Sequence, residues 1–259
     1  MCSIKGHVII ALVLLVALGL GGIHLACGVA PTPAPPPSPP PVVLTKIQFL
    51  GQACFVITSS TGLKVMTDPY TVTSTLTYSP VDETSDIVTV SHEHGDHNNV
   101  AVVKGQPEVI KGVGVNTVKG IEFKGMATWH DAAGGAQRGP NTVFVFSVDG
   151  VKLCHLGDLG HRLSSEQVSQ IGSIDILLIP VGGNYTIDAK TATGVCDSLK
   201  PKVIIPMHYK TSRANLPIAT VDDFLQGKEN VKRLNGSIFQ FKPGDLPAAP
   251  QIMVIDPAR

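Results

Sequence analysis

The sequence predicts a domain of the α/β class in which two mixed β-sheets carry helices on their outer sides. One observation is the composition, because only 15% of the 259 residues are charged and 43% are hydrophobic, as in a packed domain and unlike a disordered chain. A second is that several short strand-like runs come first in the chain. A third is that later strands alternate with helices, which favours mixed sheets covered by helices.

The first part of the domain predicts a meander of strands. Gly51 and Thr61-Gly62 separate runs rich in β-branched residues, which are typical of strands joined by tight turns. A short helix is expected over 98–104, and Asp149-Gly150 predicts a hairpin turn. The strands expected here cover 42–50, 54–58, 63–67, 86–91, 108–110, 121–129, 142–148 and 151–156.

The second part predicts strands that alternate with helices. Ser164 and Gln167 form a capping-box pattern at the start of a helix over 164–171. Asp188 can cap a second helix over 187–199, and a short third one is expected over 221–225. Buried strands are expected over 174–181 and 202–207, and 231–241 predicts a closing strand or hairpin.

The N-terminal segment predicts targeting or anchoring. Lys5 supplies a positive charge, and residues 8–23 are an unbroken run of sixteen apolar or glycine residues. Three interpretations remain open: a cleaved signal peptide that releases a secreted protein, a retained signal anchor, or cleavage before Cys27 with lipid added to its thiol. All three place the domain outside the cytoplasm, and two of them tether it to a membrane.

A Pro-rich linker follows this segment. Residues 31–41 contain eight prolines in eleven positions, a composition that favours a stiff polyproline II spacer. The sequence therefore predicts a signal peptide or membrane anchor over 1–30, a linker over 31–41 and one domain over 42–259.

Charge and cysteine content exclude two classes of protein. Twenty basic and twenty acidic residues give a net charge of zero, so the chain has no basic surface for nucleic acid. Within the predicted domain, Cys54, Cys154 and Cys196 are an odd number at wide spacing, which does not predict a disulfide framework. We expect a small-molecule substrate and make no prediction of oligomeric state.

A cluster of histidines and an aspartate predicts a metal site. His92, His94, Asp96 and His97 lie within six residues, directly after an apolar strand. Residues i and i+2 of an extended chain point the same way, and Gly95 permits a turn that brings Asp96 and His97 round to the same place. The cluster thus offers nitrogen and carboxylate ligands, without sulfur, to two adjacent metals.

This H-x-H-x-D-H motif resembles the signature of the metallo-β-lactamase superfamily. The resemblance runs over most of residues 44–241 and continues in the segments 129–131, 155–161, 179–186 and 205–209. These segments resemble the small stand-alone metal-dependent hydrolases, a branch that includes the bacterial ascorbate-phosphate lactonases. The resemblance implies an αββα sandwich of two mixed sheets with the metals at the sheet edges.

The resemblance also implies the ligands of two metals. One metal is expected at His92, His94 and His130, and the second at Asp96, His97 and His208, with Asp158 bridging them. Asp96 is also the expected catalytic residue, which orients the nucleophile or transfers its proton. Zinc is the metal expected first, and manganese or iron also suits these ligands.

Further residues are candidates for support or for substrate contact. Asp68 matches an early family aspartate, and we expect it to orient a metal-binding histidine through the far ring nitrogen. His155 and His161 flank Asp158 and are expected to support the site or face the substrate. Arg138 and Asn141, in a Gly-rich loop, are expected to support the site or to contact an anionic substrate.

The expected reaction is hydrolysis by a hydroxide held between two metals. An ester, lactone, amide or phosphodiester bond could be the target. The alternatives are a phosphodiesterase acting on phospholipid-like or nucleotide substrates, and a non-enzymatic metal-binding envelope protein. Two departures from the family pattern are Gln52, where many relatives have histidine, and Asp158, where the best-known zinc β-lactamases have cysteine.

Overall fold

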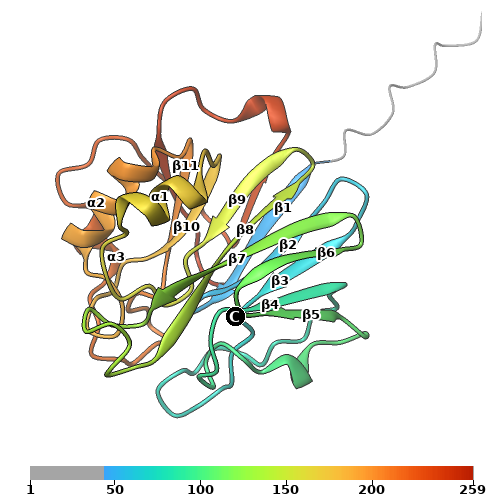
Figure 1. The fold of residues 1–259 in the computed structure, drawn as a ribbon, viewed down its shortest axis with the longest axis horizontal. Coiled ribbons are helices and arrows are strands. Elements are labelled where there is room, and N and C mark those ends of the chain that lie inside the picture. Colours follow the sequence, from blue (N-terminus) through green and yellow to red (C-terminus); the bar gives the residue numbers. More distant parts are fainter. Residues whose placement is uncertain (1–43, 259) are drawn as a thin grey trace, which may run out of the picture. The chain divides into compact units, whose positions relative to one another are not determined.

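A computed structural model describes residues 44–258 of the protein (Figure 1). Residues 1–41 lie outside the described residues. These include the predicted signal peptide or membrane anchor and the predicted Pro-rich linker. In the part of the chain that is described, no helix combines the length and apolar character needed to cross a membrane.

The first sheet is built mainly from the N-terminal part of the domain. Its six strands lie in the order β13-β1-β2-β3-β4-β5. The pairs from β13 to β3 are antiparallel, whereas β4 and β5 run parallel to β3, so the sheet is mixed. The strands are β1 (Thr45–Gly51), β2 (Cys54–Thr58), β3 (Lys64–Thr67), β4 (Ile87–Val90), β5 (Glu108–Lys111) and β13 (Ile238–Phe241).

The second sheet has eight strands in the order β12-β14-β11-β10-β9-β8-β7-β6. Strands β6 to β9 form an antiparallel meander, and β9, β10, β11, β14 and β12 run parallel to one another. The strands are β6 (Gly114–Val118), β7 (Ile121–Trp129), β8 (Pro140–Val148), β9 (Val151–His155), β10 (Ile176–Pro180), β11 (Val203–Met207), β12 (Val231–Arg233) and β14 (Gln251–Val254).

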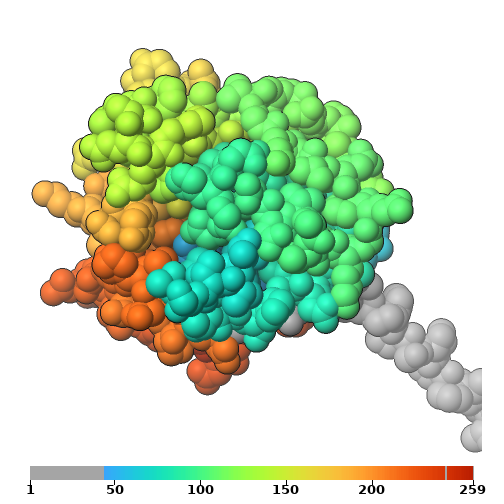
Figure 2. Space-filling view, turned by 90° about the horizontal axis from the view of Figure 1, so that it is seen from below, coloured from blue at the N-terminus to red at the C-terminus, as the bar shows by residue number. Residues whose placement is uncertain are grey.

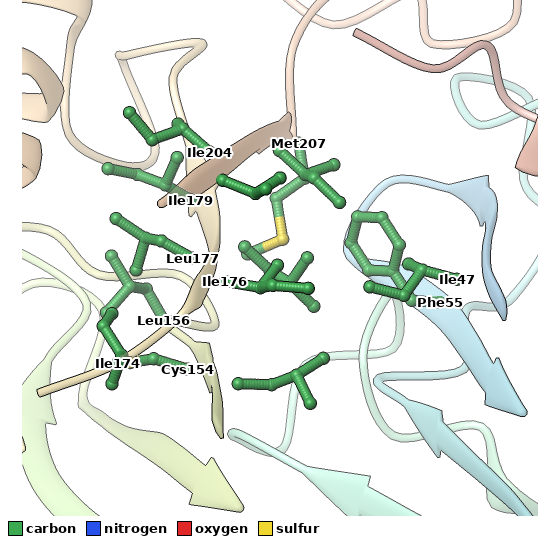
Figure 3. Packing of buried hydrophobic residues seen from close by; sticks show 14 of the residues in the cluster. Ile47, Phe55, Cys154, Leu156, Ile174, Ile176, Leu177, Ile179, Ile204 and Met207 are labelled. Carbon is green, nitrogen blue, oxygen red and sulfur yellow. The ribbon is translucent and has the colours of Figure 1, made fainter. Parts of the chain in front are cut away.

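The main hydrophobic core lies between the two sheets. Ile47 and Phe55 from the first sheet and Ile176 and Met207 from the second are fully buried in one cluster (Figure 3). Alternate residues of each strand face this core because successive side chains of a strand point to opposite faces. The predicted sandwich of two mixed sheets is confirmed.

The outer layers of the two sheets differ. Helices α1 (Ser165–Ile171), α2 (Ala189–Leu199) and α3 (Val221–Leu225) cover the eight-stranded sheet (Figure 1). The outer face of the six-stranded sheet is instead covered by loop residues, among them Tyr70 and Tyr78, which are buried against Met66 and Val88. This loop also forms one wall of the site described below.

The expected helix over 98–104 is a single 3-10 turn, Val100–Val102. Asn99 gives this turn no side-chain cap, and the Lys104 N–H bonds to the Glu83 carbonyl at 2.9 Å. A helix cannot continue where its backbone donors are used by another segment. The predicted short helix is therefore present, but only as this one turn.

The segment 231–241 is neither one strand nor a hairpin. Its first part, β12, pairs with β14 in the eight-stranded sheet, and its last part, β13, pairs with β1 in the other sheet. The chain crosses between the sheets at residues 234–237. Strands β6 and β14 were not predicted. Four of the five residues of β6 are exposed, so this strand has no buried face that alternating apolar residues would have indicated.

Candidate metal centre

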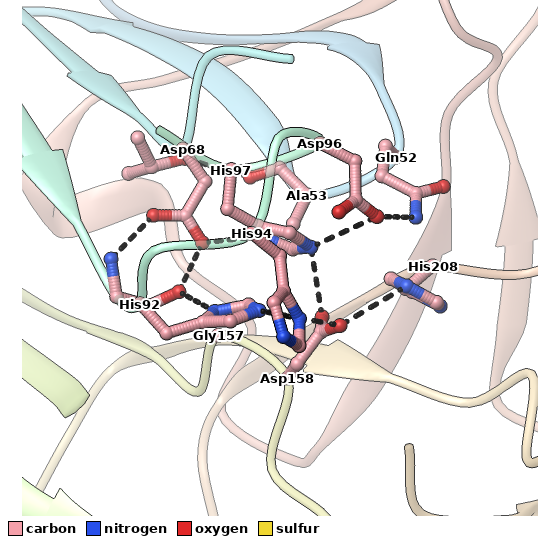
Figure 4. A network of polar contacts seen from close by, with 12 residues as sticks. Gln52, Ala53, Asp68, His92, His94, Asp96, His97, Gly157, Asp158 and His208 are labelled. Atoms are coloured by element: carbon pink, nitrogen blue, oxygen red, sulfur yellow. Dashed lines mark hydrogen bonds and ion pairs between the residues drawn. The ribbon is translucent and has the colours of Figure 1, made fainter. Parts of the chain in front are cut away.

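The predicted ligands all follow the carboxyl ends of strands. His92, His94, Asp96 and His97 lie in the loop after β4, and His130 follows β7 directly. Asp158 lies three residues after β9, and His208 follows β11. The side chains from these four strand ends meet in two groups of potential ligands, and Figure 4 shows those that follow β4, β9 and β11. Short loops on a rigid scaffold hold them in place.

His92, His94 and His130 form a first group of nitrogen donors. His92 Nε2 and His94 Nδ1 are 3.0 Å apart, and the His92 and His130 rings are 4.7 Å apart between centroids. Burial and the neighbouring His97 lower the pKa of His92 to about 3. The neutral ring keeps its nitrogen lone pair available to a metal ion.

Asp96, His97, Asp158 and His208 form a second group. His97 Nε2 lies 3.4 Å from Asp96 Oδ2 and 3.3 Å from Asp158 Oδ1. Burial alone would lower the pKa of His97, but the Asp158 and Asp96 carboxylates outweigh burial and raise it well above its usual value. In the protein without metal, His97 therefore carries the proton that a metal ion would displace.

Asp158 lies between the two groups. Its Oδ2 atom is 3.2 Å from His130 Nε2 and 3.3 Å from His208 Nε2. Burial would raise the pKa of Asp158, but His208 and His97 hold it well below the usual value, so the carboxylate is ionised. One charged carboxylate therefore contacts a histidine of each group, as expected for a bridging ligand.

Two atoms of the centre test whether metal ions fit. Asp158 Oδ1 and His97 Nε2 are buried and have no hydrogen-bond partner among the described residues, although they face each other at 3.3 Å. Buried polar atoms are normally paired, and both of these atoms point at the other ligand atoms. Nitrogen and carboxylate donors without sulfur suit zinc, manganese or iron. The residues present therefore fit divalent metal ions.

Asp68 supports the centre from behind, as the sequence predicts. Its Oδ2 atom is 2.8 Å from His97 Nδ1, and its Oδ1 atom accepts the Ser91 N–H at 2.8 Å. The Ser91 hydroxyl bonds to Asp68 and lies 3.0 Å from His92 Nδ1. The far nitrogens of one histidine from each group are thus held by one small network.

Gln52 also supports the centre, and it was not among the predicted site residues. Its side-chain Nε2 donates to Asp96 Oδ2 at 2.9 Å, and its backbone carbonyl accepts the His208 backbone N–H at 2.9 Å. Gln52, Asp68 and His208 have positive φ values of 54°, 39° and 48°. Non-glycine residues in this region concentrate at functional sites. The sequence signal that could have found Gln52 was its position directly after Gly51, where β1 ends.

Comparison with known proteins identifies the family. The family described as "Beta-lactamase superfamily domain" matches residues 46–208, a range that contains every predicted ligand. The chain belongs to the metallo-β-lactamase superfamily. It is 32% identical over 195 residues to a UPF0173 metal-dependent hydrolase of Pelotomaculum thermopropionicum, which covers 64% of this chain and 85% of the relative.

Other relatives agree with this assignment. A UPF0173 metal-dependent hydrolase of Carboxydothermus hydrogenoformans is 33% identical over 193 residues, covering 64% of this chain and 85% of that protein. The structure of a proposed Zn-dependent hydrolase of the superfamily from Thermotoga maritima matches with a TM-score of 0.70 and 42% identity, covering 82% of this chain and 98% of that one. The protein is a metal-dependent hydrolase, and the predicted enzyme class is confirmed.

Asn141 and His155 do not face the substrate side of this hydrolase. Asn141 is buried, accepts the Asp158 N–H at 2.9 Å and donates to the Leu156 carbonyl at 2.9 Å. His155 is fully buried and lies 3.0 Å from the Ala53 carbonyl through Nε2. Of the two roles expected for Asn141, the structure therefore gives it support of the site and not substrate contact. Both residues hold the strand end that presents Asp158.

His161 organises a neighbouring loop. Its Nε2 accepts the Trp129 N–H at 3.1 Å, and its Nδ1 lies 2.7 Å from the Arg162 carbonyl. His161 therefore supports the segment before His130 and is not among the residues that line the cavity over the centre.

Gly157 allows the chain to reach Asp158, because a Cβ atom there would meet the side chains of Asn141 and Ser91.

A cavity of about 520 Å³ opens over the centre. Figure 2 looks onto this edge of the molecule, where the surface is hollowed between the blue-green, yellow-green and orange segments. Asp96, His94, His130, Asp158 and His208 form its floor. Its walls comprise Thr71, Thr73, Thr75, Leu76, Gly95, Arg138, Tyr185 and Leu216.

Proposed function

We propose that the protein holds two divalent metal ions, zinc first among them, and hydrolyses a carboxylic ester or lactone of a small molecule. The observation that carries this proposal is the position of Asp158, whose Oδ2 lies 3.2 Å from His130 and 3.3 Å from His208. A single carboxylate shared by two donor groups is the arrangement that holds two cations close together. His92, His94 and His130 would hold one ion, and Asp96, His97 and His208 the other.

Two metal ions bound there would lower the pKa of a shared water molecule and polarise the bond to be cleaved. The protein's own contribution to proton transfer falls to Asp96. Its side chain is 28% exposed to the cavity, and Gln52 holds Oδ2 at 2.9 Å. Burial would raise the pKa of Asp96, but His97 holds it well below its usual value, so the carboxylate of the metal-free centre is ionised. At the edge of the cavity this carboxylate is placed to orient the attacking water and to take up its proton.

The leaving group needs that proton back. When the bond to the carbonyl carbon breaks, Asp96 can return the proton to the leaving oxygen, which restores its carboxylate for the next cycle. His208 and His97 are held for these steps by the Gln52 backbone carbonyl and by the Asp68 carboxylate, respectively. Such a preorganised site needs little rearrangement during reaction.

The cavity walls favour a small substrate with a largely neutral body. Of the described residues that line the cavity, Arg138 is the one with a permanent positive charge, while threonines and leucines form most of the remaining wall. Esters and lactones are therefore the first choice, with amides and phosphodiesters as alternatives.

We further propose that the protein is exported and tethered to a membrane. This rests on Lys5, the apolar run 8–23, Cys27 and the eight prolines of 31–41. A tether of this kind would place the cavity outside the cytoplasm, where a small substrate diffuses to it. Secretion after cleavage is the alternative.

Metal analysis and a substrate panel test the hydrolase proposal. Full-length protein purified in detergent without chelator should contain close to two divalent ions per chain, measured by plasma mass spectrometry. His94→Ala should lose most of the metal of the first group, while the circular dichroism spectrum stays that of a folded protein.

The panel then identifies the bond. It includes 4-nitrophenyl esters, a γ-lactone, an anilide and bis-4-nitrophenyl phosphate, each assayed with and without added zinc, manganese or iron. Turnover of esters or the lactone, lost in His94→Ala, supports the proposal. Turnover of the phosphodiester alone would replace it with the phosphodiesterase alternative, and absence of bound metal would contradict both.

A further inference from the structure

Arg138 lies at the junction of two cavities above the metal centre. It lines the cavity of about 520 Å³ and a neighbouring one of about 370 Å³, and His94 is the other residue shared by both. Its guanidinium carbon lies 5.5 Å from the centre of the Tyr185 ring, a distance at which the cation is attracted to the ring face. Both side chains are half-buried.

This cation has no acidic partner within residues 44–258, since none of the ion pairs in that part of the protein includes it. Lys111, which lines the smaller cavity, is different because it pairs with Glu93 at 2.9 Å. Arg138 is therefore the permanent positive charge at the cavity junction that is left available to a ligand.

The backbone of Arg138 is fixed by Asp131. Asp131 is buried, and its two carboxylate oxygens accept four backbone N–H groups at 2.8 to 3.0 Å, from Ala133, Gly135, Gln137 and Arg138. Asp131 directly follows the predicted ligand His130. One carboxylate thus ties the segment that carries Arg138 to the segment that carries a metal ligand, which sets the distance between the two.

We propose that Arg138 binds an anionic group of the substrate, a carboxylate or a phosphate that is separate from the bond being cleaved. A guanidinium presents a planar fork of N–H donors that matches such oxygen groups. Tyr185 orients the fork, and Asp131 positions the loop that carries it. This inference rests on the proposed function, and it selects monoanionic esters or lactones as the substrate class.

Matched substrates test this assignment. Mono-4-nitrophenyl glutarate and 4-nitrophenyl pentanoate differ by a terminal carboxylate in place of a methyl group. In Arg138→Gln, the ratio of kcat/KM for the anionic ester to that for the neutral ester should fall about 10- to 100-fold, the range for a lost hydrogen bond to a charged group. Arg138→Lys keeps the charge without the fork and should fall between the two.

Arg162→Gln is the matched control. Arg162 is exposed, lies against Gly194 and lines neither cavity, so its loss should leave the ratio unchanged. An equal fall for both esters in Arg138→Gln, or the same fall in Arg162→Gln, would contradict an anion site at Arg138.

Binding provides a second measurement that does not need turnover. Trp129 is the sole tryptophan of the chain, and a Cβ atom at Gly135 would meet its ring, so its fluorescence reports on this loop. Full-length protein treated with chelator is titrated with monomethyl glutarate, methyl phosphate and neutral methyl butyrate. One or both anions should bind more tightly than the neutral ester, and Arg138→Gln should remove the difference; which anion binds identifies the group.

The two measurements separate failure of this inference from failure of the proposed function. If no ester is hydrolysed but anion binding still depends on Arg138, the ester hydrolase proposal is wrong and the anion site stands. If esters are hydrolysed while Arg138→Gln changes neither the kcat/KM ratio nor anion binding, the anion site is wrong and the hydrolase proposal stands.

Discussion

The Asp68 carboxylate lies 2.8 Å from His97 Nδ1, and both side chains are completely buried. With its Nδ1–H donated to Asp68, His97 has its Nε2 atom directed toward Asp96 and Asp158, and a metal ion bound there would take the place of the Nε2 proton. The pair therefore fixes both the tautomer and the orientation of the ring. Contacts of this kind behind a metal ligand determine how well it can bind.

Asp68→Asn should weaken metal binding without removing a ligand. Asparagine keeps the size of the side chain but loses the charge that accepts from His97, so we expect metal affinity to fall about 10- to 100-fold. Competition with a fluorescent zinc chelator measures the affinity. Glu93→Gln makes the same chemical change at an exposed residue of the same motif, whose carboxylate contacts Asn98 and Lys111, and should leave it unchanged. Equal affinities in the two variants would contradict this role of Asp68.

Asp158→Asn should separate the two metals. The amide lacks the charge that offsets the mutual repulsion of two cations, so the second ion should be lost while the three-histidine group keeps its own. Hydrolysis of the substrate identified by the panel should fall by about 100-fold or more, as when one preorganised electrostatic element is removed. Metal content and kcat are measured together, and two bound ions with full activity would contradict the two-metal mechanism.

Asp149 connects the two sheets at a turn, and its loss should destabilise the fold in a pH-dependent way. This residue of the β8–β9 turn accepts from Thr45 Oγ1 at 2.6 Å and from Ser60 N and Oγ at 2.6 and 2.9 Å. Asp149→Asn keeps a residue type that tolerates positive φ. We expect the free energy of unfolding at pH 7 to fall by about 1–3 kcal/mol.

The sign of the pH dependence follows from the pKa of Asp149. Burial would raise this pKa, but the hydrogen bonds from Thr45 and Ser60 lower it below the usual value. A depressed folded-state pKa gives stability above the unfolded-state pKa of about 3.9, and this stability is lost as the pH falls through the folded-state value. Urea unfolding of chelator-treated protein should therefore show a smaller difference at pH 3 than at pH 7. Asp256→Asn, at an exposed residue, is the control and should have little effect at either pH.

Cys27→Ser tests how the protein is held at the membrane. The positive Lys5, the apolar run and the Pro-rich segment lead us to expect the protein in the membrane fraction of its native host. If a lipid on Cys27 holds it, the variant should be released or mislocalised; if a retained apolar segment holds it, the variant should stay in place. Full-length protein in the soluble cytoplasmic fraction would contradict export altogether.

The local part of the metal centre could be predicted from the sequence. His92, His94, Asp96 and His97 lie close together because they follow one strand, and no long-range contact is needed to group them. Asp68 could also be anticipated, because the family resemblance supplied its role. Most strands and all three α-helices were predicted because apolar periodicity and caps such as Ser164 are local signals.

The contacts that depend on which strand ends meet could not be predicted from the sequence. Gln52 reaches Asp96 across 44 positions of the chain, and Arg138 reaches the ring of Tyr185 through a loop shaped by Asp131. Nothing local to Asn141 distinguishes a buried support of Asp158 from a surface residue that meets substrate. Likewise, residues 231–241 divide between the two sheets because β12 pairs with β14 in one sheet and β13 pairs with β1 in the other. The sequence by itself predicted one cluster of metal-binding residue types, His92, His94, Asp96 and His97, because residue type and short spacing carry that information, and the family resemblance added the more distant His130, Asp158 and His208. Tertiary structure decided which residues support those ligands and that the Arg138 side chain faces the cavity. Both depend on how the two sheets stack, because the stacking brings together strand ends that are far apart in the chain.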